Sequence, residues 1–86
     1  MNAQKVTDQQ CRQIKQADVD AVMAVELRCY PFPWTAGIFR DCLYAGHECW
    51  MLEGRQGIIG YFVLSCAAGE GHLLNICVAP EHQGFG

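Results

Sequence analysis

The stretch that decides the fold reads His72-Leu73-Leu74-Asn75-Ile76-Cys77-Val78-Ala79-Pro80-Glu81-His82-Gln83-Gly84-Phe85-Gly86. Its first part is a short, mostly aliphatic run, which is typical of a β-strand. Pro80 ends this strand because a proline has no backbone N–H to donate. The segment 83–86 contains two glycines, which allow positive φ and can turn several backbone N–H groups toward one anion. We therefore predict a strand that leads into a phosphate-binding loop.

Two more strands are expected upstream, at residues 47–52 and 58–65, joined by a glycine-containing hairpin loop at residues 53–57. A second loop, at residues 66–71, leads to the strand described above. The strand at 58–65 is almost continuously apolar, which indicates burial on both faces of a sheet. Gly60 within it indicates a bulge or a close approach of another backbone.

A first helix is expected before these strands. Asp18 is a candidate N-cap for it, and the helix should end near Cys29, since Pro31 disfavours helical conformation in the residue before it. The apolar stripe of this helix would consist of Val19, Val22, Met23, Leu27 and Tyr30.

A second helix is expected over residues 36–44, with Thr35 as its N-cap and Gly46 as its C′ residue. Its apolar face would consist of Ile38, Phe39, Cys42 and Leu43. Residues 11–16 alternate weakly and predict an edge strand, while residues 1–10 are expected to be disordered. The order β-α-α-β-β-β predicts an α/β (α+β) fold, in which two helices pack on an antiparallel meander.

Composition narrows the class of function. A chain of 86 residues forms one domain at most. Its net charge of −3 provides no electrostatic footprint for nucleic acid or for an anionic membrane, so we expect neither partner. No apolar run approaches the roughly 20 residues of a membrane span.

The six cysteines are interpreted as free thiols. Their spacing is irregular, no C-x-x-C or C-x-x-H pair occurs, and the polar start of the chain does not resemble a signal peptide. Free cysteine behaves as a small apolar residue in reducing compartments. We therefore expect a cytoplasmic protein without a disulfide framework and without a bound metal.

An aromatic loop, Tyr30-Pro31-Phe32-Pro33-Trp34, separates the two expected helices. Prolines stiffen such a loop, and aromatic side chains offer broad amphipathic surface, which suits the binding of a substrate. A loop that fills the core between two helices would have the same composition. Both interpretations stay open, since a rigid aromatic loop can do both.

The segment 78–86 resembles the acetyl-CoA signature of the GCN5-related N-acetyltransferases (GNAT), in which a strand ending in V-x-P runs into Q/R-x-x-G-x-G/A. Gln83 matches the first position and Gly86 the first obligatory glycine, and the last two positions would follow Gly86. Three stretches are also similar to the bacterial ribosomal-protein-alanine N-acetyltransferases: Glu26-Leu27-Arg28, Phe32-Pro33-Trp34-Thr35 and Leu74-Asn75-Ile76-Cys77-Val78-Ala79-Pro80. This similarity covers residues 12–86, and it implies that residues 1–86 are the N-terminal portion of one GNAT domain, truncated at the acetyl-CoA loop.

The resemblance implies transfer of an acetyl group from the cosubstrate acetyl-CoA to the N-terminal alanine of a ribosomal protein. Main-chain groups of the strand would bind the pantetheine arm as if it were another strand. The glycine-loop amides would bind the pyrophosphate, and Gln83 would brace the turn. The implied cofactor-binding residues are Ile76, Cys77, Val78, Gln83, Gly84, Phe85 and Gly86. Ordinary strand core and a plain surface turn are the alternatives for these two segments.

The acceptor protein would contact Phe32, Pro33, Trp34 and Glu26. Glu26 would orient the acceptor amine, or it would be a carboxylate on the helix surface. The family's catalytic base and acid lie after the glycine loop, so no catalytic residue is expected here and the 86-residue chain is expected to be inactive.

Glu70 and His72, near the start of the key strand, are expected to be solvated. Two other functions stay open. One is an acetyltransferase of small amines, and the other is a non-catalytic module that pairs, or self-associates, through an open sheet edge.

Overall fold

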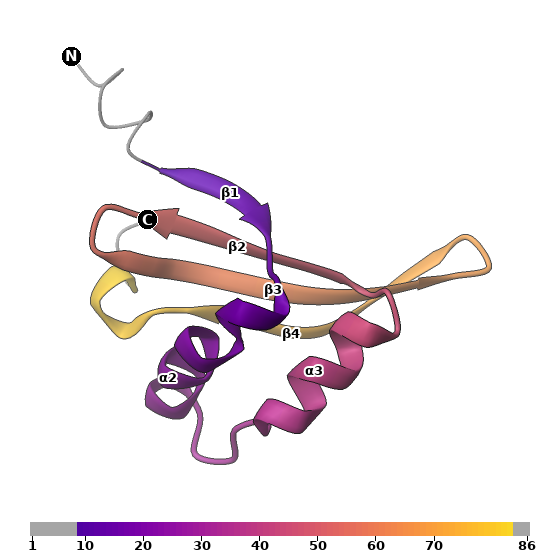
Figure 1. Cartoon of the computed structure of the whole chain (residues 1–86), viewed down its shortest axis with the longest axis horizontal. Helices are drawn as coiled ribbons and strands as arrows, with labels where there is room; N and C mark the ends of the chain where they lie inside the picture. The colour runs from indigo at the N-terminus through magenta and orange to yellow at the C-terminus, as the bar shows by residue number, and fades with distance from the viewer. Residues whose placement is uncertain (1–8, 84–86) are drawn as a thin grey trace.

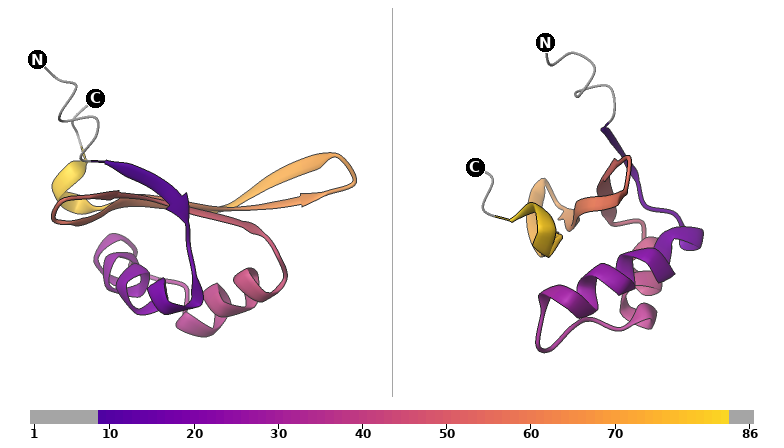
Figure 2. Two further views of the ribbon diagram at one scale, coloured as in Figure 1. Left: turned by 45° about the horizontal axis from the view of Figure 1, so that its top comes forward. Right: turned by 90° about the vertical axis from the view of Figure 1, so that its left-hand side faces the viewer.

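The computed structural model describes residues 9–83. They form β1 (Gln10–Gln13), α2 (Val19–Cys29), α3 (Ala36–Tyr44), β2 (Glu48–Gly54), β3 (Gly57–Ala67) and β4 (Glu70–Val78), with 3₁₀ turns at Gln16–Asp18 and Pro80–His82. The strands make one antiparallel sheet in the order β1-β2-β3-β4. Both helices lie on the same side of this sheet (Figure 1, Figure 2). The predicted α+β meander with two helices is confirmed.

The boundaries of the strands differ from the prediction at both hairpins. The expected loop at residues 66–71 is a two-residue turn, in which Ala68 and Gly69 have φ values of 52° and 78°. Positive φ at both positions matches the right-handed twist of the flanking strands. The β3–β4 hairpin therefore extends as an arm beyond the helices (Figure 1). Small residues and glycines predicted a loop here, although most of them pair as strand.

Other boundaries differ by a few residues. The loop expected at 53–57 is a turn at residues 55–56, and β1 ends at Gln13, before the 3₁₀ turn. Gln10, which was expected to be disordered, belongs to β1, whereas residues 1–8 lie outside the described part of the chain. β1 is an edge strand, as predicted.

Helix α2 buries the predicted face except at Leu27. Leu27 is 61% exposed, whereas Val25 is buried and Glu26 is 1% exposed. At 100° per residue, Leu27 lies well away from the centre of the buried face, which is set by Val19 and Val22. The predicted stripe was therefore wrong at Leu27, because it followed hydrophobicity and excluded the buried carboxylate.

Asp18 precedes α2, as predicted for an N-cap, but its side chain does not cap that helix. Its carboxylate instead accepts two hydrogen bonds of 2.9 Å from the guanidinium of Arg12 and one of 2.8 Å from the N–H of Lys15. Arg12 also donates to Glu53 on β2. This cluster holds β1 and the 3₁₀ turn together at the edge of the sheet.

Helix α3 has the predicted bounds and caps. The Thr35 hydroxyl accepts a 3.2 Å hydrogen bond from the N–H of Ile38. At the other end Gly46 has a φ of 82°, and the N–H groups of Gly46 and His47 donate to carbonyls in the last turn, which is a Schellman motif. Phe39 is buried as expected, although Ile38, predicted on the same face, is 41% exposed.

The core lies between the helices and one face of the sheet. Its buried apolar members are Ile14, Val19, Val22, Val25, Phe39, Cys49, Met51, Tyr61, Val63, Cys77 and Ala79. Phe62 and Leu64 of β3 are only half-buried, because no helix among residues 9–83 covers the other face of the sheet (Figure 2). The predicted burial of β3 on both faces is therefore not found in this part of the chain. No helix within residues 9–83 is long and apolar enough to cross a membrane.

Gly60 is predicted to be intolerant of a side chain. A Cβ there would lie 2.7 Å from the backbone oxygen of Cys77, beside the register shift between Leu52 and Glu53. Both predicted features, a close backbone approach and an adjacent irregularity, are present. Because a strand backbone cannot move aside easily, we expect Gly60→Ala to lower the free energy of unfolding by about 1–3 kcal/mol in urea titration.

Gly71→Ala is the matched control, since a Cβ at Gly71 would meet only side-chain atoms of Leu64 at ordinary distances of 3.8–3.9 Å. An equal loss of stability in the two variants would contradict the close-approach explanation.

The Arg12–Asp18 contact predicts a pH dependence. Hydrogen bonding from Arg12, the largest cause, lowers the pKa of Asp18 from 3.8 to about 2. A carboxyl with a lowered pKa in the folded state stabilises the fold above its unfolded pKa, and this contribution is lost as the pH falls through the folded pKa. The stability difference between the native chain and Asp18→Asn should therefore shrink as the pH falls from 3.8 to about 2.

Urea titrations across this pH range measure the difference. Asp20→Asn is the control, because the Asp20 side chain is 94% exposed and lies 3.7 Å from Arg40. A stability difference for Asp18→Asn that does not change with pH would contradict the assignment.

Candidate functional site

The candidate site lies on the outer edge of β4, which ends the sheet formed by the described strands. Ala79 donates its N–H to the carbonyl of Ile59 at 2.8 Å. In an antiparallel pair, the backbone groups of alternate residues point toward the partner strand. The groups of Cys77 therefore face β3, and those of Ile76 and Val78 face the open edge.

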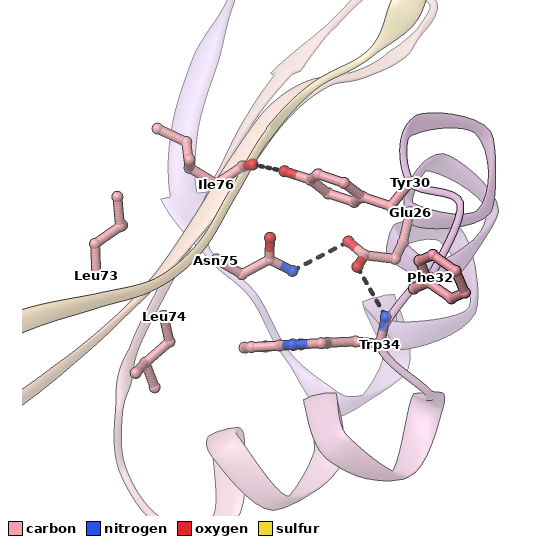
Figure 3. Close-up of a pocket in the computed structure, with 8 residues that line it drawn as sticks. All are labelled: Glu26, Tyr30, Phe32, Trp34, Leu73, Leu74, Asn75 and Ile76. Atoms are coloured by element: carbon pink, nitrogen blue, oxygen red, sulfur yellow. Dashed lines mark hydrogen bonds between the residues drawn. The ribbon is translucent and has the colours of Figure 1, made fainter.

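Side chains from neighbouring segments bind the two outward carbonyls. The Tyr30 hydroxyl donates to the carbonyl of Ile76 (Figure 3). The carbonyl of Val78 accepts a 2.7 Å hydrogen bond from the Gln83 side-chain amide and a 3.5 Å hydrogen bond from the thiol of Cys29. These donors belong to side chains and not to a strand, so another amide can replace them without disrupting the sheet.

The sequence-predicted cofactor residues thus fall into four groups. Ile76 and Val78 have backbone groups at the open edge, whereas those of Cys77 face β3. Gln83 supports the turn after β4, because its N–H donates to the carbonyl of Pro80 at 3.3 Å. The remaining three, Gly84, Phe85 and Gly86, lie outside the described residues.

A pocket of about 330 Å³ lies between β4 and the aromatic loop (Figure 3). Aromatic and aliphatic side chains dominate its walls, and a few polar groups converge on it. It is lined by Glu26, Tyr30, Phe32, Trp34, Leu73, Leu74, Asn75 and Ile76. Apolar walls combined with convergent polar groups are common in ligand sites.

Glu26 joins four segments around this pocket. One carboxylate oxygen accepts a 3.0 Å hydrogen bond from the N–H of Trp34, and the other accepts from the Tyr61 hydroxyl at 2.6 Å and the Asn75 amide at 3.1 Å. Figure 3 shows the contacts with Trp34 and Asn75. A buried carboxylate requires such donors, since it has lost its hydration. Glu26 is therefore not the helix-surface carboxylate of the alternative interpretation.

Burial keeps the side chains of Tyr61, Tyr30 and Cys77 protonated. Burial, followed by the hydrogen bond to Glu26, raises the pKa of Tyr61. Burial is also the main cause of the raised pKa of Tyr30. Burial, followed by the contact with Cys29, raises the pKa of Cys77 to about 12. These three groups therefore act as neutral hydrogen-bonding groups near neutral pH.

The aromatic loop contributes to both the core and the surface. Trp34 is half-buried and packs edge-on against Phe39, with ring centroids 5.0 Å apart, and Phe39 in turn contacts Tyr61 at 5.9 Å. Pro33 is half-buried, but Phe32 is 91% exposed. Trp34 thus fixes the loop on the core, and Phe32 remains accessible beside the pocket.

Several residues of the site were not predicted from the sequence. Tyr30 was assigned to a helix stripe and to the aromatic loop, and Tyr61 to an apolar strand, but neither hydroxyl was expected to donate within the site. One sequence feature did indicate a polar contact at this place, namely Asn75, a polar residue inside an otherwise aliphatic strand. Glu70 and His72 are exposed, as expected, and lie 3.4 Å apart.

The arrangement can bind an extended, amide-containing molecule along β4 and hold a second molecule in the adjacent pocket. Among residues 9–83, no group of three or more His, Cys, Asp or Glu side chains could hold a metal ion.

No protein-family model matches the sequence, and no curated protein sequence matches it significantly. Solved structures do match. The ribosomal-protein-S18-alanine N-acetyltransferase from Escherichia coli has a TM-score of 0.81 and 21% sequence identity, covering 88% of this chain and 49% of that chain. A GNAT-like decarboxylase, GphF, solved in complex with isobutyryl-CoA, has a TM-score of 0.76 and 20% identity, over 88% of this chain and 51% of that chain.

A third match is the spermidine/spermine N-acetyltransferase from Vibrio cholerae, with a TM-score of 0.65 and 15% identity, over 91% of this chain and 54% of that chain. The chain therefore spans about half the length of the solved structures that it matches. These matches show that the described residues have a fold similar to that of about half of each of these GNAT-type structures.

Proposed function

We propose that the chain is the acetyl-CoA-binding portion of a GNAT acyltransferase of the cytoplasm, and that the complete enzyme transfers an acetyl group from acetyl-CoA to the N-terminal alanine of a ribosomal protein. The observation that carries this proposal is the open edge of β4, where the carbonyls of Ile76 and Val78 face outward beside an aromatic pocket. The similarity to three CoA-dependent or acetyl-transferring enzymes of the same fold supports it.

The open edge fits the pantetheine arm of acetyl-CoA. This arm is extended and carries amide groups, which can pair with a strand edge as another strand would. Its N–H groups would replace the Tyr30 hydroxyl on Ile76 and the side-chain donors on Val78. Cys77 would contribute only by packing, since its backbone faces β3. Binding of the pyrophosphate by the amides of residues 84–86 remains part of the proposal.

The pocket favours a peptide acceptor over a small polyamine. A polycation needs carboxylates that are free to pair with it. The one carboxylate that lines this pocket belongs to Glu26, which is 1% exposed and already accepts three hydrogen bonds. The other walls include Phe32, Trp34 and two leucines, which suit the apolar side chains of a peptide N-terminus.

Calorimetric titration of the 86-residue chain with acetyl-CoA tests the edge directly. Val78→Pro removes an outward-facing N–H without removing a hydrogen bond of the sheet, which an edge strand tolerates. If this N–H pairs with the pantetheine arm, the substitution should weaken acetyl-CoA binding roughly tenfold, the equivalent of one hydrogen bond. Val78→Ala keeps the N–H and should bind like the native chain.

Cys11→Pro is the matched control on the opposite edge of the sheet. Ile14 donates to the carbonyl of Cys49, so by the same alternation the N–H of Cys11 faces outward from β1. This variant should retain full affinity for acetyl-CoA. An equal loss in both proline variants, or no loss in Val78→Pro, would contradict the proposed role of β4.

Phe32→Ala tests the acceptor site. Phe32 is 91% exposed, so its removal should leave stability unchanged but abolish the NMR shift changes produced by an alanine-starting peptide. Tyr44→Ala, at an equally exposed aromatic residue outside the pocket, should not affect them. Spermidine is the competing ligand. Shift changes at the pocket with spermidine but not with the peptide would favour a small-amine acceptor.

A further inference from the structure

Two cysteines meet beneath the open edge of β4. Cys29 is the last residue of α2, and Cys77 lies near the end of β4, 48 residues later. Their sulfur atoms are 2.6 Å apart, and both are free thiols. Among the cysteines, all of which lie in the described part of the chain, this is the one sulfur–sulfur hydrogen bond. The two sulfurs are therefore close enough for one to attack the other, displace a leaving group that it carries and form the bond of roughly 2.05 Å of a disulfide.

We propose that Cys29 and Cys77 are a modification site, at which a low-molecular-weight disulfide such as oxidised glutathione introduces a reversible intramolecular disulfide. This inference does not depend on the proposed acetyltransferase function. It rests on the pairing of the two sulfurs and on their unequal exposure.

The unequal exposure of Cys29 and Cys77 sets the order of the two thiol–disulfide exchange steps. Cys77 is 5% exposed and Cys29 is half-buried, so only Cys29 is accessible to a small oxidant. Its thiolate would attack one sulfur of the oxidant, forming a mixed disulfide and releasing the first thiol. Cys77 would then lose its proton and attack the sulfur of Cys29, releasing the second thiol. The protein loses two electrons and two protons, which the oxidant carries away as two thiols.

The raised pKa of Cys77 is consistent with this order, since a buried neutral thiol is a poor initial nucleophile but can react with a sulfur that it already contacts. The product would link the end of α2 to β4. The thiol hydrogen that Cys29 donates to the carbonyl of Val78 would be lost. Tyr30, the next residue after Cys29, donates to the carbonyl of Ile76. Oxidation would therefore remove one of the two donors on the carbonyl of Val78, next to the Tyr30 contact with Ile76.

The test uses a Cys11→Ser/Cys66→Ser variant, which removes the two exposed thiols. The folded protein is equilibrated in mixtures of reduced and oxidised glutathione, and its remaining free thiols are alkylated. Its mass is then measured by mass spectrometry before and after digestion with trypsin. Cleavage after arginine places Cys29 in residues 29–40, Cys42 and Cys49 in residues 41–55, and Cys77 in residues 56–86. We expect a loss of two hydrogens in mass and a linked pair of peptides, 29–40 with 56–86.

Two further measurements complete the test. Oxidation should raise the urea midpoint by about 1 to 2 M, since the disulfide closes a long loop of the unfolded chain. Adding Cys77→Ala should abolish the linked pair and leave glutathione on Cys29. A disulfide involving residues 41–55, or a folded protein that stays fully reduced or only glutathionylated in oxidised glutathione, would overturn the proposal.

Discussion

The buried carboxylate of Glu26 is the constraint on which the candidate site depends. It lies on α2 and accepts hydrogen bonds from the aromatic loop, from β3 and from β4. A charge at this depth is tolerated only while its donors are in place, and each donor is fixed by the charge in turn. The pocket between the loop and β4 therefore has defined walls, although the segments that form them are far apart in sequence.

The sheet contributes a second constraint, which is the alternation of its backbone. Because Cys77 pairs with Tyr61 and Gly60 allows the two backbones to approach closely, the groups of Ile76 and Val78 must face outward. Side chains then complete the edge: Tyr30, Gln83 and Cys29 provide hydrogens for two carbonyls that lack a neighbouring strand among residues 9–83. The edge is thus polar and accessible, but its carbonyls are hydrogen-bonded.

Much of the fold could be predicted from local signals. Thr35 and Gly46 marked the ends of α3, and Pro80 marked the end of β4, because each has a direct effect on backbone hydrogen bonding. The ion pair that Asp18 makes with Arg12 could not be predicted, since Arg12 lies on β1 and the contact depends on the folded chain. The burial of Glu26 in place of Leu27 was missed for the same reason, because its partners come from three other segments.

The site was predictable only in part. Val78, Pro80 and Gln83 identified the edge strand and the turn after it, because they belong to a pattern that is continuous in sequence. Tyr30, Tyr61 and Cys29 could not be assigned, since their roles depend on where their hydroxyl and thiol groups end up in three dimensions. An apolar pattern that counts tyrosine as an apolar residue gives no information about its hydroxyl group.

The position of β1 has a consequence for the order of folding. β2, β3 and β4 are joined by tight turns, so they can pair with little loss of chain entropy, whereas β1 reaches β2 only across both helices. Closing that long connection becomes favourable once the helices have docked and Arg12 can contact both Asp18 and Glu53. We expect the two hairpins to be formed in the folding transition state and β1 to pair with β2 only afterwards.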